Sequence, residues 1–393
     1  MEMISFEKAF GIVMGSEVIT ETEKIDFRDS SGRILAENVV SDTDMPPFDK
    51  ASMDGYACRL QDLDLDLEIV DTIPAGKYPE RNISRGECSK IMTGAQVPAG
   101  ADCIVIVEDT EVLPSGKIRI TGNSSKHNIA FKGEDIIKGD VVLQPGKLIK
   151  PQDIAVMASV GHTSVRVSRS PDVAIISSGS ELVEPWELPG ISQIRNSNSF
   201  QLMAQAGRTG ARSKYYGIAK DNEEETFLLI KKAISENDLT IISGGVSVGE
   251  FDFVPAVMKR AGVDILFSRL AIKPGKPTTF GKVDGKFVFG LPGNPVSSFM
   301  LFELLVRPFI YRIMGYDWKP LRIKLALKED ISRKYSDRMA LLPVIITDDN
   351  EVKPVEYHGS AHISALPHAF GIIEIPVGIN RVKKGEIVSV RQI

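Results

Sequence analysis

The chain has 393 residues, which is enough for about two to four domains that each bury a hydrophobic core. Its formal net charge of −5 gives no basic surface of the kind that nucleic acids require, so we expect no DNA or RNA partner. No segment reaches the ~20 consecutive apolar residues of a membrane span, so we expect no membrane association either.

Three cysteines, Cys58, Cys88 and Cys103, are sparse and lack the spacing of a zinc site. The first ten residues contain acidic side chains and no long apolar core, which excludes a signal peptide from this stretch. We therefore expect reduced thiols and a cytoplasmic protein.

The first 135 residues indicate mainly strands and turns. Ser5 is predicted to cap a helix over 6–17, and residues 33–41 read as a strand. Residues 44–57 are rich in proline, aspartate and glycine, which predicts an irregular loop that serves either a site or a domain junction. Short strands from about 58–135 predict a small β domain, and 91–109 reads as a hairpin within it.

The middle of the chain changes character. Pro151 is predicted to open a helix, and residues 171–316 alternate strands with helices, which is typical of a parallel sheet with crossover helices. Asn198 and Asp221 are expected to cap two of those helices.

A long apolar helix is predicted to begin at Asn294-Pro295, and Pro308 is expected to kink it. After Trp318 the pattern returns to short strands, which predicts a C-terminal β domain.

Three glycine-rich polar turns follow predicted strands, at 177–181, 243–252 and 290–298. The carboxyl ends of parallel strands share one sheet edge, where ligands bind in open α/β sheets. A fourth turn at 273–276 is expected on the same edge, and its Lys273 and Lys276 suit an oxyanion or phosphate. A single such turn is as consistent with an ordinary strand-to-helix connection, but four together favour a binding site.

The 243–252 turn has the strongest chemical signal. Gly244, Gly245 and Gly249 allow positive φ and close approach to a ligand. Glu250 and Asp252 offer the hard oxygen ligands that Mg²⁺ prefers.

Six motifs in one order carry a resemblance that covers essentially the whole chain. They are DMPPFDKASMDGYA (44–57), IMTGAQVPAGADCIVIVED (91–109), KGEDI (132–136), SGGVSVGEFDF (243–253), AIKPGKP (271–277) and GLPGNPVSS (290–298). Together they resemble the molybdopterin molybdotransferase family, which includes the C-terminal part of gephyrin.

The resemblance implies a multidomain fold of class α/β plus β. It implies a split elongated domain at 1–43 and 136–168, an inserted β domain at 44–135, an α/β molybdopterin-binding domain at 169–318 with a parallel sheet, and a C-terminal β barrel at 319–393. It also implies a homodimer whose active site is shared between the α/β domain of one subunit and the inserted domain of the other.

The implied reaction inserts molybdate, or tungstate, into adenylylated molybdopterin, with Mg²⁺-dependent hydrolysis and release of AMP. The resemblance assigns catalysis to Asp54, Thr93, Asp252, Lys273 and Lys276, and the Mg²⁺ to Glu250 and Asp252. Substrate contacts fall to Ser178, Glu181, Gly244, Gly245, Ser247, Gly249, Pro292, Asn294, Ser297, Arg338 and Ser360. The last two are implied to hold molybdate.

Two departures from the family pattern stand out. Ser180 occupies a position where the family usually has an acid, and the basic residues that often precede Gly-Glu-Asp are reduced to Phe131-Lys132. Two alternatives remain open: a molybdopterin adenylyltransferase, whose single α/β domain resembles 171–316, and a non-catalytic molybdopterin-binding scaffold or sensor.

Overall fold

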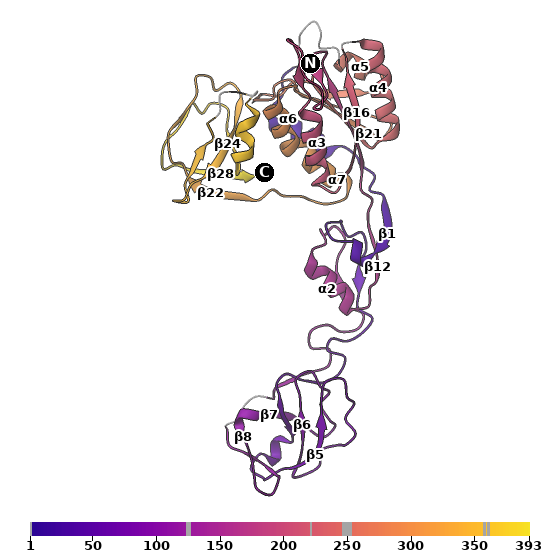
Figure 1. The fold of residues 1–393 in the computed structure, drawn as a ribbon, viewed down its shortest axis with the longest axis vertical. Coiled ribbons are helices and arrows are strands. Elements are labelled where there is room, and N and C mark those ends of the chain that lie inside the picture. The colour runs from indigo at the N-terminus through magenta and orange to yellow at the C-terminus, as the bar shows by residue number, and fades with distance from the viewer. Residues whose placement is uncertain (1, 123–126, 221, 246–253, 357–358, 360–361) are drawn as a thin grey trace. The chain divides into compact units, whose positions relative to one another are not determined.

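The computed structural model describes residues 2–122, 127–220, 222–245, 254–356, 359 and 362–393 (Figure 1). The chain divides into two compact units. Unit 1 comprises Met1–Glu23, Gly32–Ile34 and Val167–Ile393, and unit 2 comprises Lys24–Ser31 and Leu35–Arg166. In the described part of the chain we find no helix with the length and hydropathy that a bilayer crossing requires.

Unit 2 contains the predicted small β domain, built on a four-stranded sheet of order β5-β6-β4-β7. Its strands are β4 (Gly55–Cys58), β5 (Glu68–Ile73), β6 (Glu87–Ile91) and β7 (Cys103–Ile106). The expected hairpin within 91–109 is wrong, because β6 and β7 each pair with β4 and not with one another. Every residue of β4 is buried, so the stretch predicted as an irregular loop supplies the central strand of this sheet.

The remaining elements of unit 2 are short. They are β2 (Val39–Val40), β3 (Lys50–Ala51), β8 (Thr110–Val112), β9 (Ile118–Ile120), β10 (Ile129–Ala130), β11 (Val141–Leu143) and α2 (Pro151–Ser159), while β1 (Thr22–Asp26) pairs with β12 (Ser164–Ser168). Pro151 opens α2 as predicted. The strand expected over 33–41 is reduced to β2, which finds only a short partner in β11.

The cysteines of unit 2 are buried thiols without a disulfide, as the sequence predicts. The Cys58 and Cys103 sulfurs lie 3.5 Å apart on facing strands.

Unit 1 contains the predicted α/β domain around a six-stranded sheet of order β16-β13-β17-β21-β20-β18. Its strands are β13 (Asp172–Ser178), β16 (Arg212–Ala219), β17 (Leu239–Ser243), β18 (Asp264–Phe267), β20 (Thr279–Val283) and β21 (Lys286–Leu291). The helices α3 (Asn198–Gly207) and α6 (Pro295–Leu301) cover one face, and α4 (Glu223–Glu236) and α5 (Val254–Arg260) the other (Figure 1).

The sheet is mixed: five of its six strands run in the predicted common direction, but only four of them are paired in parallel, because β20 is reversed. The strands β16, β13, β17 and β21 are parallel, but β20 runs antiparallel to both of its neighbours, β21 and β18. The reason is the two-residue turn Asp284-Gly285, where φ is 47° and 76°. Aspartate-glycine with positive φ at both positions is the signature of a tight hairpin, and a hairpin makes adjacent strands antiparallel.

Helix starts follow the sequence in part. Ser5 caps α1 (Phe6–Gly15), accepting from the Lys8 amide at 3.2 Å, as predicted. Asp221 lies outside the described residues, and it is Asn222 that caps α4 through the amides of Glu224 and Glu225. Asn198 is the first residue of α3 and not its cap.

The long apolar helix predicted after Asn294 is interrupted. Following α6, a π-helical segment (Phe302–Val306) leads into α7 (Arg307–Ile313), with Pro308 in the first turn of α7. Proline lacks an amide hydrogen, which is consistent with the irregular helical hydrogen bonding just before it.

The C-terminal strands form a second six-stranded sheet. The path runs β19 (Ile272–Lys273), β24 (Met339–Ile346), β26 (Gly371–Ile375), β28 (Ile387–Gln392) and β22 (Arg322–Ala326), with β25 (Val352–Pro354) on β24. Elsewhere in unit 1, β14 (Leu182–Val183) pairs with β15 (Ile194–Arg195) and β23 (Ile331–Ser332) with β27 (Arg381–Val382). Among the described residues the path is open at both ends, so the expected closed barrel is not found there.

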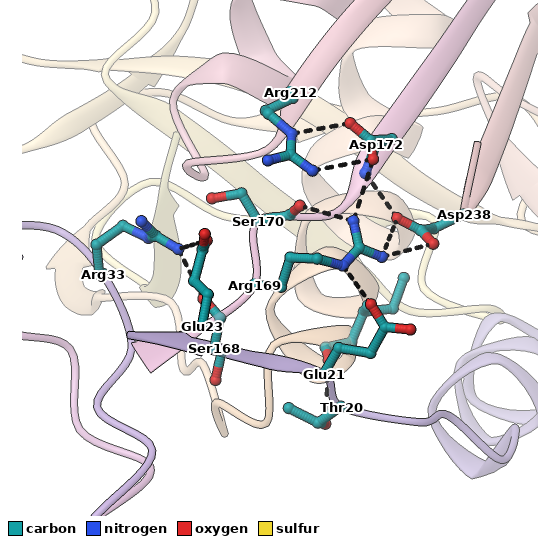
Figure 2. Close-up of polar contacts among 11 residues, drawn as sticks. Thr20, Glu21, Glu23, Arg33, Ser168, Arg169, Ser170, Asp172, Arg212 and Asp238 are labelled. Carbon is teal, nitrogen blue, oxygen red and sulfur yellow. Dashed lines mark hydrogen bonds and ion pairs between the residues drawn. The ribbon is translucent and has the colours of Figure 1, made fainter. Parts of the chain in front are cut away.

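Charged side chains tie four distant segments together at the amino ends of the parallel strands (Figure 2). Arg169 contacts both carboxylate oxygens of Asp238 at 2.8 Å, Asp172 at 3.1 Å and Glu21 at 2.5 Å. Arg212 forms a two-pronged pair with the same Asp172, at 2.9 and 3.0 Å. A shared network of this kind is worth more than isolated surface pairs, because each charge has several fixed partners.

We predict that Arg169→Met lowers the free energy of unfolding of unit 1 by about 2–3 kcal/mol, since three carboxylates lose a charged hydrogen-bond donor while the apolar stem is kept. Urea unfolding followed by tryptophan fluorescence measures it, because Trp186 and Trp318 both belong to unit 1. Lys319→Met is the control within the same unit: Lys319 pairs with Asp317 at 3.2 Å, but its side chain is 82% exposed, so a much smaller change is expected. Equal losses in the two variants would contradict the network.

The same effect has a pH dependence. The hydrogen bonds from Arg212, then its charge and that of Arg169, hold the pKa of Asp172 below its ordinary value of 3.8. The stabilisation is therefore complete above that value and is lost as the pH falls through the lower pKa of the folded state. The difference in the free energy of unfolding between the wild type and Arg169→Met should therefore become smaller over the same acid range, as measured by the same urea unfolding at lower pH.

Candidate functional site

Three parallel strands of unit 1 end side by side. Ser177 of β13 lies opposite Ser243 of β17, which lies opposite Leu291 of β21. The polar turns that follow these strands therefore share one edge of the sheet, as the sequence predicts.

A cavity of about 650 Å³ opens at this edge, and we call it cavity 1. Among the residues expected at the site, six line it: Ser178, Glu181, Gly244, Gly245, Pro292 and Asn294. The hydroxyl oxygen of Ser178 is buried and has no hydrogen-bond partner among the described residues, so it is available to a ligand.

Gly244 explains why the floor of cavity 1 is made of backbone. Its φ is +94°, and a β-carbon added there would lie 2.2 Å from the carbonyl oxygen of Ser178. Only glycine allows the ends of β13 and β17 to approach so closely.

Asn198 joins the turns beneath cavity 1. Its side-chain amide donates to the Ser243 hydroxyl at 2.8 Å and to the Gly293 carbonyl at 2.7 Å. This role explains why Asn198 does not cap its helix. Sequence reasoning missed it, together with the cavity residues Arg195 and Asn196, because a cap-like asparagine before a helix has a simpler local explanation.

A second cavity of about 720 Å³, cavity 2, adjoins the first, since Pro277, Pro292 and Asn294 line both. The expected residues Lys273, Lys276, Ser297 and Arg338 line it as well. The prediction that the lysine turn lies on the edge of the α/β sheet is wrong, because Lys273 belongs to β19, which pairs with β24 of the C-terminal sheet.

Cavity 2 is strongly basic in its described lining. Five basic side chains face one acidic side chain there: Lys273, Lys276, Arg333, Lys334 and Arg338 against Asp337. Such an excess of positive charge favours a small polyanion.

Arg333 was not expected at the site, but it holds the loop that carries Arg338. Its guanidinium donates to the carbonyl of Arg338 at 2.8 Å and to the carbonyls of Pro376 and Ile379 at 2.5 Å each. Burial lowers the pKa of Arg333 from its usual value. No signal in the sequence separates it from a solvent-exposed arginine.

Asp54 and Thr93 come together in unit 2. The amide and the hydroxyl of Thr93 both donate to one oxygen of Asp54, at 2.6 Å each. These two hydrogen bonds hold the pKa of the Asp54 carboxyl below its ordinary value. The residues lie 39 positions apart in sequence, so the pairing is made by the fold of the β domain.

The remaining expected residues, Ser247, Gly249, Glu250, Asp252 and Ser360, lie outside the described residues. The flanks of the first four are described. The Val254 amide donates to the carbonyl of Gly245 at 3.2 Å, so the two described residues that flank them lie next to each other, and Gly245 lines cavity 1.

Comparison with known proteins matches three family profiles along the chain. They are the MoeA N-terminal region (domain I and II) over residues 4–161, a probable molybdopterin binding domain over 174–312, and the MoeA C-terminal region (domain IV) over 324–393. The molybdopterin molybdenumtransferase of Staphylococcus epidermidis is 38% identical over 98% of this chain and 95% of its own length. That of Staphylococcus aureus is 35% identical over 92% and 88%.

The chain belongs to the MoeA family of molybdopterin molybdenumtransferases. Two solved structures of the MoeA protein from Pyrococcus horikoshii agree with this. One is 32% identical with a TM-score of 0.85 over 100% of this chain and 99% of that one, and the other 29% identical with a TM-score of 0.87 over 100% of both. The MoeA multidomain fold and the transferase class expected from the six motifs are thereby confirmed.

We predict that Gly244→Ala in this MoeA family member disrupts the floor of cavity 1. The added carbon meets a backbone carbonyl, which cannot rotate away, so the free energy of unfolding should fall by about 1–3 kcal/mol. Gly207→Ala is the matched control, because nothing lies within 4 Å of its β-carbon position at the end of α3. Urea unfolding that is unchanged in Gly244→Ala would contradict the close approach.

Proposed function

We propose that this chain inserts molybdate into adenylylated molybdopterin, with hydrolysis of the phosphoanhydride and release of AMP. The observation that carries the proposal is the pair of adjoining cavities with different chemistry. Cavity 1 offers backbone, serine and asparagine groups to a pterin and its phosphate, and cavity 2 offers five basic side chains to an oxyanion.

In this proposal the chain binds and orients both substrates. Ser178, Gly244, Gly245, Pro292 and Asn294 hold molybdopterin at the strand ends, together with Ser247 and Gly249 of the adjoining segment. Molybdate is held close to it by Lys273, Lys276, Ser297, Arg338 and Ser360. The positive charge of the basic side chains among them offsets the negative charge of both substrates. Tungstate, which has the same charge and nearly the same size, is an alternative oxyanion.

The proposed Mg²⁺ ligands are Glu250 and Asp252, whose carboxylate oxygens are the type that this ion prefers. They belong to the segment that follows Gly245 of cavity 1, where Glu181 supplies a further carboxylate. When bound there, Mg²⁺ neutralises negative charge on the phosphoryl oxygens.

We further propose a homodimer in which Asp54 and Thr93 of one subunit complete the cavities of the other. The fixed, ionised carboxylate of Asp54 supports this role, since its hydrogen bonds to Thr93 keep it charged at neutral pH. The four-domain division into 1–43 with 136–168, 44–135, 169–318 and 319–393, including a closed C-terminal barrel, remains part of the proposal. Three thiols without disulfides support a cytoplasmic location.

Two alternatives compete with this proposal. A molybdopterin adenylyltransferase would need only the α/β domain, whereas family profiles match this chain on both sides of it. A non-catalytic scaffold would need no cluster of basic side chains beside the pterin cavity, and cavity 2 has one.

The decisive measurement is AMP release from adenylylated molybdopterin by the purified protein with Mg²⁺, with and without molybdate or tungstate. We expect release that depends on the oxyanion, and a loss of about 100-fold or more in Asp252→Asn with the fold retained. Tight binding of the substrate without release under either oxyanion would favour the scaffold.

The shared site predicts complementation between two inactive variants. Asp54→Asn and Asp252→Asn should each be inactive alone, because every site then lacks one carboxylate. When the two variants are co-expressed, some dimers contain one subunit of each. One site of such a heterodimer combines the intact Asp252 of one subunit with the intact Asp54 of the other. Recovery of AMP release supports the shared site, and no recovery in a verified heterodimer shows that each chain works alone.

A further inference from the structure

Residues 181–196 contain the strands β14 and β15 and the segment that connects them, and we call this stretch the β14–β15 flap. The two strands pair in parallel through Leu182 with Ile194 and Val183 with Arg195. Five flap residues line cavity 1: Glu181, Leu182, Ile194, Arg195 and Asn196. The segment between the strands carries Trp186, which is 73% exposed.

A chain of hydrogen bonds runs from the floor of cavity 1 to this flap. The Ser177 hydroxyl donates to the side-chain oxygen of Asn196 at 2.9 Å, and the side-chain NH2 of Asn196 donates to the Tyr215 hydroxyl at 2.9 Å. The Tyr215 hydroxyl in turn donates to the Glu184 carboxylate at 2.7 Å. Tyr215 therefore holds the flap at two points, near each of its ends.

Further buried contacts connect the members of this hydrogen-bond network. Ser199 completes it, accepting from the Asn196 amide at 3.2 Å and lying 2.7 Å from the Ser177 hydroxyl. Ser177, Asn196 and Ser199 are each at most 2% exposed. Buried polar groups keep a unique arrangement only when all of them are paired, and Tyr215 supplies the donor that Glu184 needs.

The ionisation and packing of Tyr215 suit this role. Burial, and then its hydrogen bond to Glu184, raise the pKa of Tyr215 above its usual range, so the hydroxyl remains a donor. The second oxygen of Glu184 is buried without a partner among the described residues, which leaves its carboxylate dependent on Tyr215. The Tyr215 ring also packs on the Phe200 ring, with their centroids 5.5 Å apart. The Phe200 ring in turn contacts the Trp186 ring edge-on, with a centroid distance of 6.3 Å.

We propose that Tyr215 is a positioning residue for substrate binding, which sets the β14–β15 flap against cavity 1 through Glu184 and Asn196. Leu182, Ile194, Arg195 and Asn196 reach cavity 1 from the flap, so a change in its position alters the shape of the cavity. Tyr215 lies outside the lining of both cavities and acts only through its partners. The effect on turnover rests on the proposed function, but the effect on the flap does not.

The test variant is Tyr215→Phe, which keeps the ring and removes the hydroxyl. We expect the KM for adenylylated molybdopterin to rise by about three- to tenfold, because the flap loses both of its hydrogen bonds to the Tyr215 hydroxyl and only part of that loss acts on cavity 1, with kcat changed less than about twofold. A merely structural tyrosine would lower the amount of folded enzyme without this split.

Tyr216→Phe is the matched control. Tyr216 is the next residue of β16, and its hydroxyl likewise donates to a glutamate, Glu236, at 2.6 Å. That glutamate lies in α4, on the other face of the sheet. Tyr216→Phe should leave KM and kcat as in the wild type.

A second readout follows the flap without turnover. The chain has two tryptophans, so protein labelled with 5-fluorotryptophan gives two ¹⁹F resonances, assigned with Trp186→Phe. We expect the Trp186 resonance to move in Tyr215→Phe and to stay in Tyr216→Phe. The Trp318 resonance should stay in both, because that ring has other neighbours: its centroid lies 4.4 Å from the guanidinium of Arg307 and 5.5 Å from that of Arg391.

The proposal stands if KM and the Trp186 resonance both change in Tyr215→Phe and neither changes in Tyr216→Phe; any other combination overturns it. If Tyr215→Phe does not fold, Glu184→Ala is judged by the same criteria, with Glu184→Gln, which keeps an acceptor oxygen, expected to restore wild-type values. A wild type that releases no AMP counts against the proposed function alone, because the Trp186 resonance still decides whether Tyr215 holds the flap.

Discussion

The parallel register of β13, β17 and β21 is the constraint on which the site depends. Parallel strands all end at the same sheet edge, so three turns that are far apart in sequence become the floor of one cavity. The close approach of Gly244 to the Ser178 carbonyl then makes that floor from backbone, and the Ser178 hydroxyl beside it has no hydrogen-bond partner among the described residues. Polar groups left unpaired at such an edge are what a polar ligand needs.

The two ends of this sheet divide the work of stability and binding. At the amino ends, Arg169 and Arg212 form ion pairs with Asp172, Asp238 and Glu21 (Figure 2). Next to the carboxyl ends, cavity 2 receives basic side chains from the β19 turn and the C-terminal region, and they outnumber the acidic ones in its described lining. Charged side chains that pair with one another stabilise the fold, whereas an excess of one sign of charge in a cavity attracts a ligand of the opposite sign.

The fold was predictable where local patterns decide it. The alternation of strands and helices after residue 171, the cap at Ser5, the helix start at Pro151 and the late β strands all follow from short-range rules, and the structure has them. Errors arose where pairing is long-range. The strand β4 lies inside a proline- and aspartate-rich stretch, but its two neighbours bury it completely. The antiparallel edge was a different kind of error, since Asp284-Gly285 carries a hairpin signal in the sequence itself.

The sequence by itself determined the family, because six motifs in one order are specific even without any geometry, and it determined which turns carry polar side chains. Only the tertiary structure decided that Lys273 belongs to the C-terminal sheet and still reaches the same cavity region as Pro292. Only the structure could show that Arg333, Asn198 and Tyr215 are hydrogen-bonded to residues that line the cavities. Such residues act through hydrogen bonds to groups far away in the chain, and a long-range contact leaves no local pattern in the sequence from which it could be read.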